Sequence, residues 1–142
     1  MTIKANALTP IPNNWSLQEA ATLPCAGLTA WRAIMEEGNL QPNETILVQG
    51  SGGVSVFALQ LAKAHGANVI ATTSSDEKAE KLKSLGADEV VNYKEHPQWG
   101  KEVLKLTANE GVDHVVEVAG GESFNESIRC AKLGGHLSII GI

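Results

Sequence analysis

Short apolar runs alternate along this chain with segments in which apolar residues recur every three or four positions. The run Thr45–Val48 is rich in β-branched side chains and is bounded by Asn43 and Gly50, which predicts a buried strand. The next segment has helical spacing, with apolar residues at Val54, Phe57, Ala58, Leu61 and Ala62. Residues with this spacing form one stripe of a helix. The turn between the two segments is therefore a strand-to-helix junction.

The same alternation continues to the end of the chain. Further strands are predicted at 67–73, 89–93, 112–119 and 136–142. The helices between them have predicted inner faces at Ala79, Leu82 and Leu85, at Trp99, Val103 and Leu106, and at Phe124, Ile128 and Ala131. Strands that alternate with helices specify an α/β fold with a parallel sheet between two helical layers. We expect a Rossmann-type doubly wound sheet of order 3-2-1-4-5, with a ligand crevice at the carboxyl ends of strands 1 and 4.

The first forty residues carry a weaker pattern. Residues 1–15 have no apolar period, which predicts an extended arm. Ser16 and Glu19 form a capping box at the start of a short helix. Pro24 does not fit the interior of that helix, so we expect it to begin a second helix that ends near residue 37.

The strand-to-helix junction carries Gly50, Gly52 and Gly53, with Ser55 where the pattern G-x-G-x-x-G has its third glycine. The first glycine allows a tight turn, and the second lets the backbone approach a pyrophosphate without a Cβ in the way. The start of the helix offers unpaired N–H groups to the phosphate charge. Serine is only slightly larger than glycine, so it weakens this motif without excluding it. Glycines also mark turns that bind nothing, and the flanking strand and helix favour the phosphate interpretation.

Composition and charge exclude several classes of partner. The 142 residues are 43% hydrophobic and 19% charged, as in an ordinary globular domain. The net charge of -5 argues against nucleic acid and against an anionic membrane surface. No apolar run reaches the roughly 18 residues of a membrane span, and the N-terminus lacks the apolar core of a signal peptide. We therefore expect a cytoplasmic protein with neither nucleic-acid nor membrane partners.

The cysteines and histidines give no metal site of their own. Cys25 and Cys130 lie far apart and form no C-x-x-C pair, which predicts two buried free thiols and no disulfide. The 4 histidines lack the spacing that brings two ligands to one helix face.

Five segments together resemble the medium-chain dehydrogenase/reductase superfamily, which includes zinc-type alcohol dehydrogenases and quinone oxidoreductases. They are LPCAGLTAW (23–31), ETILVQGSGGVSVFALQLAKAHGA (44–67), KLKSLGADEVVNY (81–93), GVDHVVEVAGG (111–121) and GGHLSIIGI (134–142). Members of this superfamily are longer, with a catalytic domain before such a segment and a sixth strand after it. The resemblance implies that residues 1–26 are a remnant of the linker or catalytic domain. Residues 27–142 would be a dinucleotide-binding Rossmann domain, truncated before the sixth strand.

The resemblance also bears on the choice of cofactor. It places Thr73 at the end of strand 2, where NAD-specific sites carry Asp or Glu for the ribose. A carboxylate there would repel a 2′-phosphate, whereas hydroxyl groups, the helix N-terminus and Lys78 could hold one. NADP(H) is therefore favoured over NAD(H). Asp76 leaves NAD(H) as an alternative, because its carboxylate could accept hydrogen bonds from the ribose hydroxyls. It could equally be only a favourable negative charge at the start of the helix. Ser74 could contact the phosphate or only cap the helix, in a box with Glu77.

The resemblance implies a set of cofactor-binding residues at the carboxyl ends of the strands. They are Thr29, Gly50, Ser51, Gly52, Gly53, Val54, Thr73, Ser74, Lys78, Tyr93, Val118, Ala119, Ile140 and Gly141. Thr29 and residues 140–142 correspond to positions near the nicotinamide, Tyr93 to the adenosine end, and Val118 and Ala119 to the ribose.

Zinc is the other ligand that the resemblance brings in. Cys25 sits where zinc-dependent relatives place a catalytic zinc ligand, but their other ligands come from the domain missing here. Because zinc needs about three protein ligands at such a site, zinc is expected in the parent protein at most, and Cys25 is otherwise a small packed thiol.

These features point to part of an NAD(P)H-dependent oxidoreductase that transfers hydride to or from a carbonyl, alcohol or activated alkene of a small-molecule substrate. We expect the fragment alone to be inactive and identify no catalytic residue in it. A non-catalytic dinucleotide-binding module is an alternative. An S-adenosylmethionine-dependent methyltransferase shares the glycine turn, but it usually has an acidic residue at the end of strand 2, and residues 73–75 provide none.

The last strand also predicts an assembly. Leu137, Ile139, Ile140 and Ile142 form an apolar edge that lacks its expected neighbour. Because apolar unpaired edges recruit other chains, we expect a homodimer through this edge.

Overall fold

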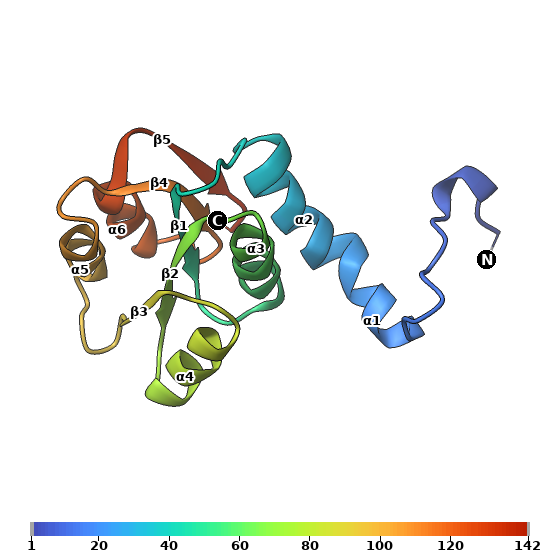
Figure 1. The fold of residues 1–142 in the computed structure, drawn as a ribbon, viewed down its shortest axis with the longest axis horizontal. Coiled ribbons are helices and arrows are strands. Elements are labelled where there is room, and N and C mark those ends of the chain that lie inside the picture. The colour runs from blue at the N-terminus through green and yellow to red at the C-terminus, as the bar shows by residue number, and fades with distance from the viewer. Residues whose placement is uncertain (1, 142) are drawn as a thin grey trace.

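The computed structural model of the protein describes residues 2–141 and contains a five-stranded sheet of order β3-β2-β1-β4-β5 (Figure 1). All paired strands are parallel. The strands are β1 (Thr45–Gln49), β2 (Asn68–Thr73), β3 (Glu89–Asn92), β4 (Val112–Glu117) and β5 (Ala131–Ile139). The helices of the sheet domain are α3 (Gly53–Ala64), α4 (Asp76–Ser84), α5 (Trp99–Leu106) and α6 (Ser123–Cys130). The predicted Rossmann-type topology is confirmed.

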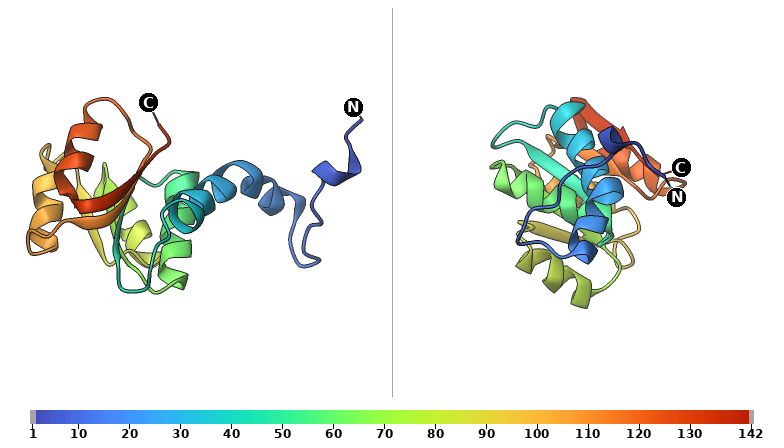
Figure 2. Two further views of the ribbon diagram at one scale, coloured as in Figure 1. Left: turned by 90° about the horizontal axis from the view of Figure 1, so that it is seen from above. Right: turned by 90° about the vertical axis from the view of Figure 1, so that its right-hand side faces the viewer.

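Two apolar layers cover the sheet because successive strand residues face opposite sides. Ile46 and Val48 of β1 pack in one cluster with Leu59 of α3. Leu47, between them, packs in the other cluster with Val103 of α5. Helices α3 and α4 therefore lie on one face of the sheet and α5 and α6 on the other (Figure 2).

The N-terminal helices form one continuous run that projects from the sheet domain (Figures 1 and 2). It comprises α1 (Leu17–Thr22), η2 (Leu23–Gly27), α2 (Leu28–Trp31) and η3 (Arg32–Glu36), after a short turn η1 (Ala5–Ala7). The Ser16–Glu19 capping box is confirmed, since Ser16 Oγ accepts the Glu19 N–H at 3.2 Å and Glu19 Oε2 accepts the Ser16 N–H at 2.8 Å. The predicted second helix is confirmed in its start, because Pro24 lies in the first turn of η2, and in its end near residue 37, because η3 ends at Glu36. Its separation from the first helix is wrong, because α1 runs directly into η2. Pro24 lies at the start of the π-helical segment η2, whose wider turn accommodates a residue without an N–H donor.

Two further details of the predicted helices, in α4 and α5, are wrong. Ser74 caps nothing, because α4 begins one residue later with Ser75 as N-cap and without a side-chain cap. Leu106 is 46% exposed, so the inner face of α5 consists of Trp99 and Val103.

The inner face of α6 differs most from the prediction. Ile128 is 52% exposed, and Ala131 belongs to β5. The buried residues of α6 are instead Ser127 and Cys130. Burial raises the pKa of the Cys130 thiol to about 12, which keeps the thiol protonated.

Strand β5 begins five residues earlier than predicted, at Ala131, and its pairing with β4 has an irregularity between Val112 and His114. Ile142, the last residue of the predicted apolar edge, lies outside the described residues. In the part of the chain that the structure describes, no helix is long and apolar enough to cross a bilayer.

Two aspartates tie neighbouring strands together at the amino edge of the sheet. Asp113 Oδ2 accepts the N–H of Thr45 at 2.9 Å, and its other oxygen accepts from Lys132 Nζ at 3.0 Å. Asp88 makes the equivalent bonds to Val69 and Lys63. Partial burial raises the pKa of Asp113, but the hydrogen bonds from Thr45 and Lys132 outweigh burial and hold that pKa below its ordinary value.

We predict that Asp113→Asn lowers the free energy of unfolding by about 1 kcal/mol near neutral pH. Because the folded-state pKa lies below the unfolded-state value, this contribution is present above the unfolded pKa, near 4, and is lost as pH falls through the folded pKa. Urea unfolding at neutral pH and near pH 3 measures the difference between wild type and variant, which should shrink in acid. The exposed Glu80→Gln is the control. Equal stabilities of Asp113→Asn and wild type at neutral pH would contradict this role.

Candidate dinucleotide site

The candidate site lies at the carboxyl edge of the sheet, beside the junction of β1 and β4. Strand β1 pairs with β2 on one side and with β4 on the other, so the chain reverses its winding direction between β1 and β4. Ligands of open α/β sheets bind at such a switch point, outside the carboxyl ends of the strands. The last residues of these two strands are Gln49 and Glu117.

The turn after β1 has the geometry of a phosphate cradle. Gly50 has φ +72°, a conformation that L side chains rarely adopt, and its N–H bonds to the Thr72 carbonyl at 2.9 Å. Gly52 is the N-cap of α3, and no side chain caps the helix there. A Cβ added to Gly52 would meet no atom within 4 Å, so the space in front of the helix is open. The first N–H groups of α3 thus face room for an anion.

Ser55 explains how the motif tolerates the missing third glycine. Its side chain is buried, and its Oγ donates to the carbonyl of Gln49 at 2.6 Å. That hydrogen bond fastens the first turn of α3 to the end of β1. Serine at this position therefore preserves the close packing of helix on strand that glycine provides in the motif.

The N-terminal helical run closes one side of the turn. A Cβ on Gly53 would lie 3.1 Å from the Cβ of Ala26 in η2. Thr29, in the following helix α2, is half-buried. Cys25 is exposed, which corrects the prediction of a buried, packed thiol. Within residues 2–141 no three His, Cys, Asp or Glu side chains gather to hold a metal, so Cys25 has no partner ligands in that part of the chain.

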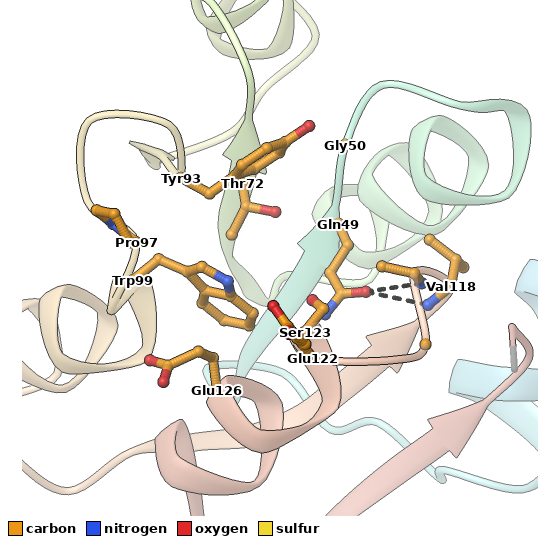
Figure 3. A pocket seen from close by; sticks show the side chains of 12 residues that line it. Gln49, Gly50, Thr72, Tyr93, Pro97, Trp99, Val118, Glu122, Ser123 and Glu126 are labelled. Atoms are coloured by element: carbon orange, nitrogen blue, oxygen red, sulfur yellow. Dashed lines mark hydrogen bonds between the residues drawn. The ribbon is translucent and has the colours of Figure 1, made fainter.

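A cavity of about 490 Å³ opens at the carboxyl edge on the face of the sheet that α5 and α6 cover, between these helices and the strand ends (Figure 3). It is lined by Gln49, Gly50, Thr72, Tyr93, Pro97, Trp99, Val118, Ala119, Gly120, Glu122, Ser123 and Glu126. Its size falls in the range of small-molecule sites. Tyr93, which is 41% exposed, offers an aromatic ring at the rim, and Trp99 is almost wholly buried.

The floor of this cavity is a polar network that connects the ends of β1 and β4. Glu117 is completely buried, and its carboxylate accepts from the amides of Ala119 and Gly120, both at 2.9 Å. It also accepts from Gln49 Nε2 at 2.8 Å and from the Ser127 hydroxyl. The side-chain oxygen of Gln49, Oε1, accepts the N–H groups of Val118 at 3.1 Å and Ala119 at 3.2 Å, and both bonds are drawn in Figure 3.

Gln49 and Glu117 were not among the site residues predicted from the sequence. The signal was present, because each is a polar residue at the last position of an otherwise apolar strand. Such a residue would be costly to bury unless it has hydrogen-bonding partners there.

The structure brings most of the predicted cofactor residues to this one edge. Tyr93 donates its N–H to the Thr73 carbonyl at 2.9 Å, which joins the ends of β2 and β3. Thr73 itself is 1% exposed, so Ser74 is the more accessible hydroxyl there, and Lys78 is exposed on α4.

The end of β5 joins the same edge. The amides of Ile140 and Gly141 both donate to the Glu117 carbonyl, at 2.8 Å and 3.2 Å. A Cβ on Gly141 would lie 2.1 Å from the carbonyl oxygen of Val118, so only glycine fits. Residues 140–141 are thereby fixed beside Val118 and Ala119.

Comparison with known proteins gives one consistent family. The zinc-binding dehydrogenase family model matches residues 53–142. A zinc-type alcohol dehydrogenase-like protein of Schizosaccharomyces pombe is 48% identical over 141 residues, which cover 98% of this chain and 41% of that protein. The chain thus spans about two fifths of the length of this curated relative.

Two solved structures agree with this result. The crystal structure of an NAD-dependent alcohol dehydrogenase has a TM-score of 0.86 at 44% identity, over 92% of this chain and 38% of that one. A mycobacterial protein complexed with NADPH also has a TM-score of 0.86, at 33% identity, over 92% and 40% of the two chains. The chain belongs to the zinc-binding dehydrogenase family, within the medium-chain dehydrogenase/reductase superfamily.

Proposed function

We propose that residues 27–142 are the dinucleotide-binding domain of an oxidoreductase that transfers hydride between a nicotinamide cofactor and a carbonyl, alcohol or activated alkene. The open, uncapped start of α3 at Gly52, located at the switch point of the sheet, is the observation that carries this proposal. The cofactor supplies the hydride chemistry, and the chain contributes binding and orientation. Members of the same family that bind NADPH or depend on NAD support this assignment.

The geometry supports an orientation for the bound cofactor. The diphosphate would lie against the N–H groups that follow Gly52, where the helix dipole favours negative charge. The adenosine half would extend toward the cavity rimmed by Tyr93 and Ala119. The nicotinamide would then lie on the opposite side, near Ile140 and Thr29, where the missing part of the enzyme would supply the substrate site.

NADP(H) is the favoured form because the end of β2 provides no carboxylate within residues 73–75. The accessible Ser74 and Ser75 and the nearby cation Lys78 could hold a 2′-phosphate. Asp76, in the first turn of α4, is the group that would favour NAD(H) instead.

We predict that Gly52→Val weakens dinucleotide binding at least tenfold without unfolding the protein. Gly52 has φ −77° and ψ 170°, which valine adopts readily, and its added Cβ would meet no protein atom. The side chain would instead fill the phosphate space, so calorimetry should show at least a tenfold loss of NADPH affinity, about 1.4 kcal/mol or more. Ala64→Val, on the exposed last turn of α3, is the matched control. Unchanged affinity in Gly52→Val would remove the main support for this function.

The cofactor preference has its own test. Lys78→Ala should weaken NADPH binding about tenfold and leave NADH nearly unchanged, because only NADPH carries the 2′-phosphate. Lys81→Ala, an exposed cation elsewhere on α4, should affect neither. If Lys78→Ala weakens both cofactors equally, or neither, the 2′-phosphate assignment is wrong.

A non-catalytic dinucleotide-binding module is the alternative, since the described residues include no group that we assign to proton transfer. Oxidation of NADPH by the full-length protein in the presence of carbonyl or quinone substrates separates the two functions. No turnover with any such substrate, together with intact NADPH binding, would favour the module.

We also propose that the chain forms a homodimer through the β5 edge. Within the described residues β5 pairs only with β4, and Ile139 is 57% exposed. Sedimentation velocity should therefore show a dimer that Ile139→Lys converts to monomer, whereas Leu106→Lys, at an exposed position on α5, should leave it intact. A wild-type monomer at high concentration would refute this assembly.

A further inference from the structure

The buried pair Gln49 and Glu117 carries an inference beyond cofactor binding at the glycine turn. Glu117 has no exposed surface, and no cation bonds to its carboxylate in the described residues. A buried charge is costly unless it is fully hydrogen-bonded. Here four donors surround the carboxylate: two backbone amides on Oε1, and Gln49 and Ser127 on Oε2.

The orientation of Gln49 is fixed by the same network. Its carbonyl oxygen accepts two backbone amides, from Val118 and Ala119, while its NH₂ group donates to Glu117 Oε2 and to Ser127 Oγ at 2.7 Å. The side-chain amide of Gln49 thus uses both acceptor sites and both donors. Turning it by 180° would place its NH₂ group against the N–H groups of Val118 and Ala119. All three successive amides of residues 118–120 are held by these two side chains.

We propose that Gln49 and Glu117 are positioning residues, which hold loop 118–120 as a rigid wall of the dinucleotide crevice. This inference rests on the proposed function, because the loop lines the cavity beside Gly50 that would hold the adenosine half. Without the carboxylate, the amide of Gly120 loses its acceptor, the amide of Ala119 keeps only the longer bond to Gln49 Oε1, and the loop loses its fixed position. The end of β5 would move with it, because Gly141 packs directly against Val118.

The network can be tested with variants of equal size and shape. In Glu117→Gln the new carbonyl must face the amides of Ala119 and Gly120, which turns its NH₂ group toward the NH₂ group of Gln49. In Gln49→Glu two carboxylates face each other. The double variant Gln49→Glu/Glu117→Gln exchanges the two groups and restores a donor opposite an acceptor at every position.

Two readouts distinguish this inference from the proposed function. The first is amide hydrogen exchange at Ala119 and Gly120 in the ligand-free protein, compared with the core amide of Val48. The second is the Kd for NADPH. We expect each single variant to exchange at least tenfold faster at residues 119 and 120 than wild type, relative to Val48, and to bind NADPH at least tenfold more weakly. The double variant should recover both values to within about threefold.

The outcomes are separable. If wild type does not bind NADPH, the proposed function fails. Hydrogen exchange at residues 119 and 120 still tests whether Gln49 and Glu117 fix loop 118–120. If wild type binds and the single variants exchange and bind as wild type does, the positioning role is overturned. Should a single variant fail to fold, the double variant decides. If it recovers slow hydrogen exchange and NADPH affinity, the positioning role is supported, and if it recovers neither, that role is overturned. Val103→Ala, a buried cavity variant in α5, controls for general destabilisation and should leave both readouts near wild type.

Discussion

The parallel pairing of β1 with both β2 and β4 is the constraint on which the rest of this structure depends. Parallel strands need crossover connections, and each connection returns the chain to the amino edge of the sheet. The carboxyl ends of all the strands therefore lie together at the opposite edge, including Gln49, Thr73 and Glu117. Residues far apart in the sequence become neighbours there without any special local signal.

The interior of the sheet and its carboxyl edge follow different rules. Within the strands, apolar residues such as Val48 on one face and Leu47 on the other pack into two layers and specify the fold. At the carboxyl edge, Gln49 and Glu117 replace apolar packing with a closed set of hydrogen bonds. Such fully satisfied polar networks rigidify a site and fix its geometry, which a crevice for a large charged cofactor requires. The amino edge uses charged groups differently, with Asp88 and Asp113 pairing to lysines near the surface.

Much of the fold could be predicted from the sequence because buried parallel strands are short apolar runs with glycine at their ends. The strand order and the glycine turn followed from that pattern. Errors occurred where tertiary contacts decide the outcome. The π-helical segment accommodates Pro24, and the polar network draws Ser127 of α6 inward where apolar spacing favoured Ile128.

The polar network itself could not be predicted from spacing. Gln49 and Glu117 are 68 positions apart and meet only because β1 and β4 are adjacent and end together. Each residue alone looks like an ordinary polar residue at a strand end. The local motif therefore predicts where a diphosphate could bind, whereas the tertiary structure reveals which side chains fix the walls around it.

The most direct measurement of the central claim is a titration of the ¹⁵N-labelled protein with NADP⁺, followed by two-dimensional NMR. If the start of α3 cradles the diphosphate, the largest shifts will be at the amides of Gly52, Gly53, Val54 and Ser55. Loss of shifts at these amides when adenosine replaces NADP⁺ would support the same assignment, because adenosine lacks the phosphates. Saturable binding with the largest shifts away from this turn, or no binding at all, would contradict the account.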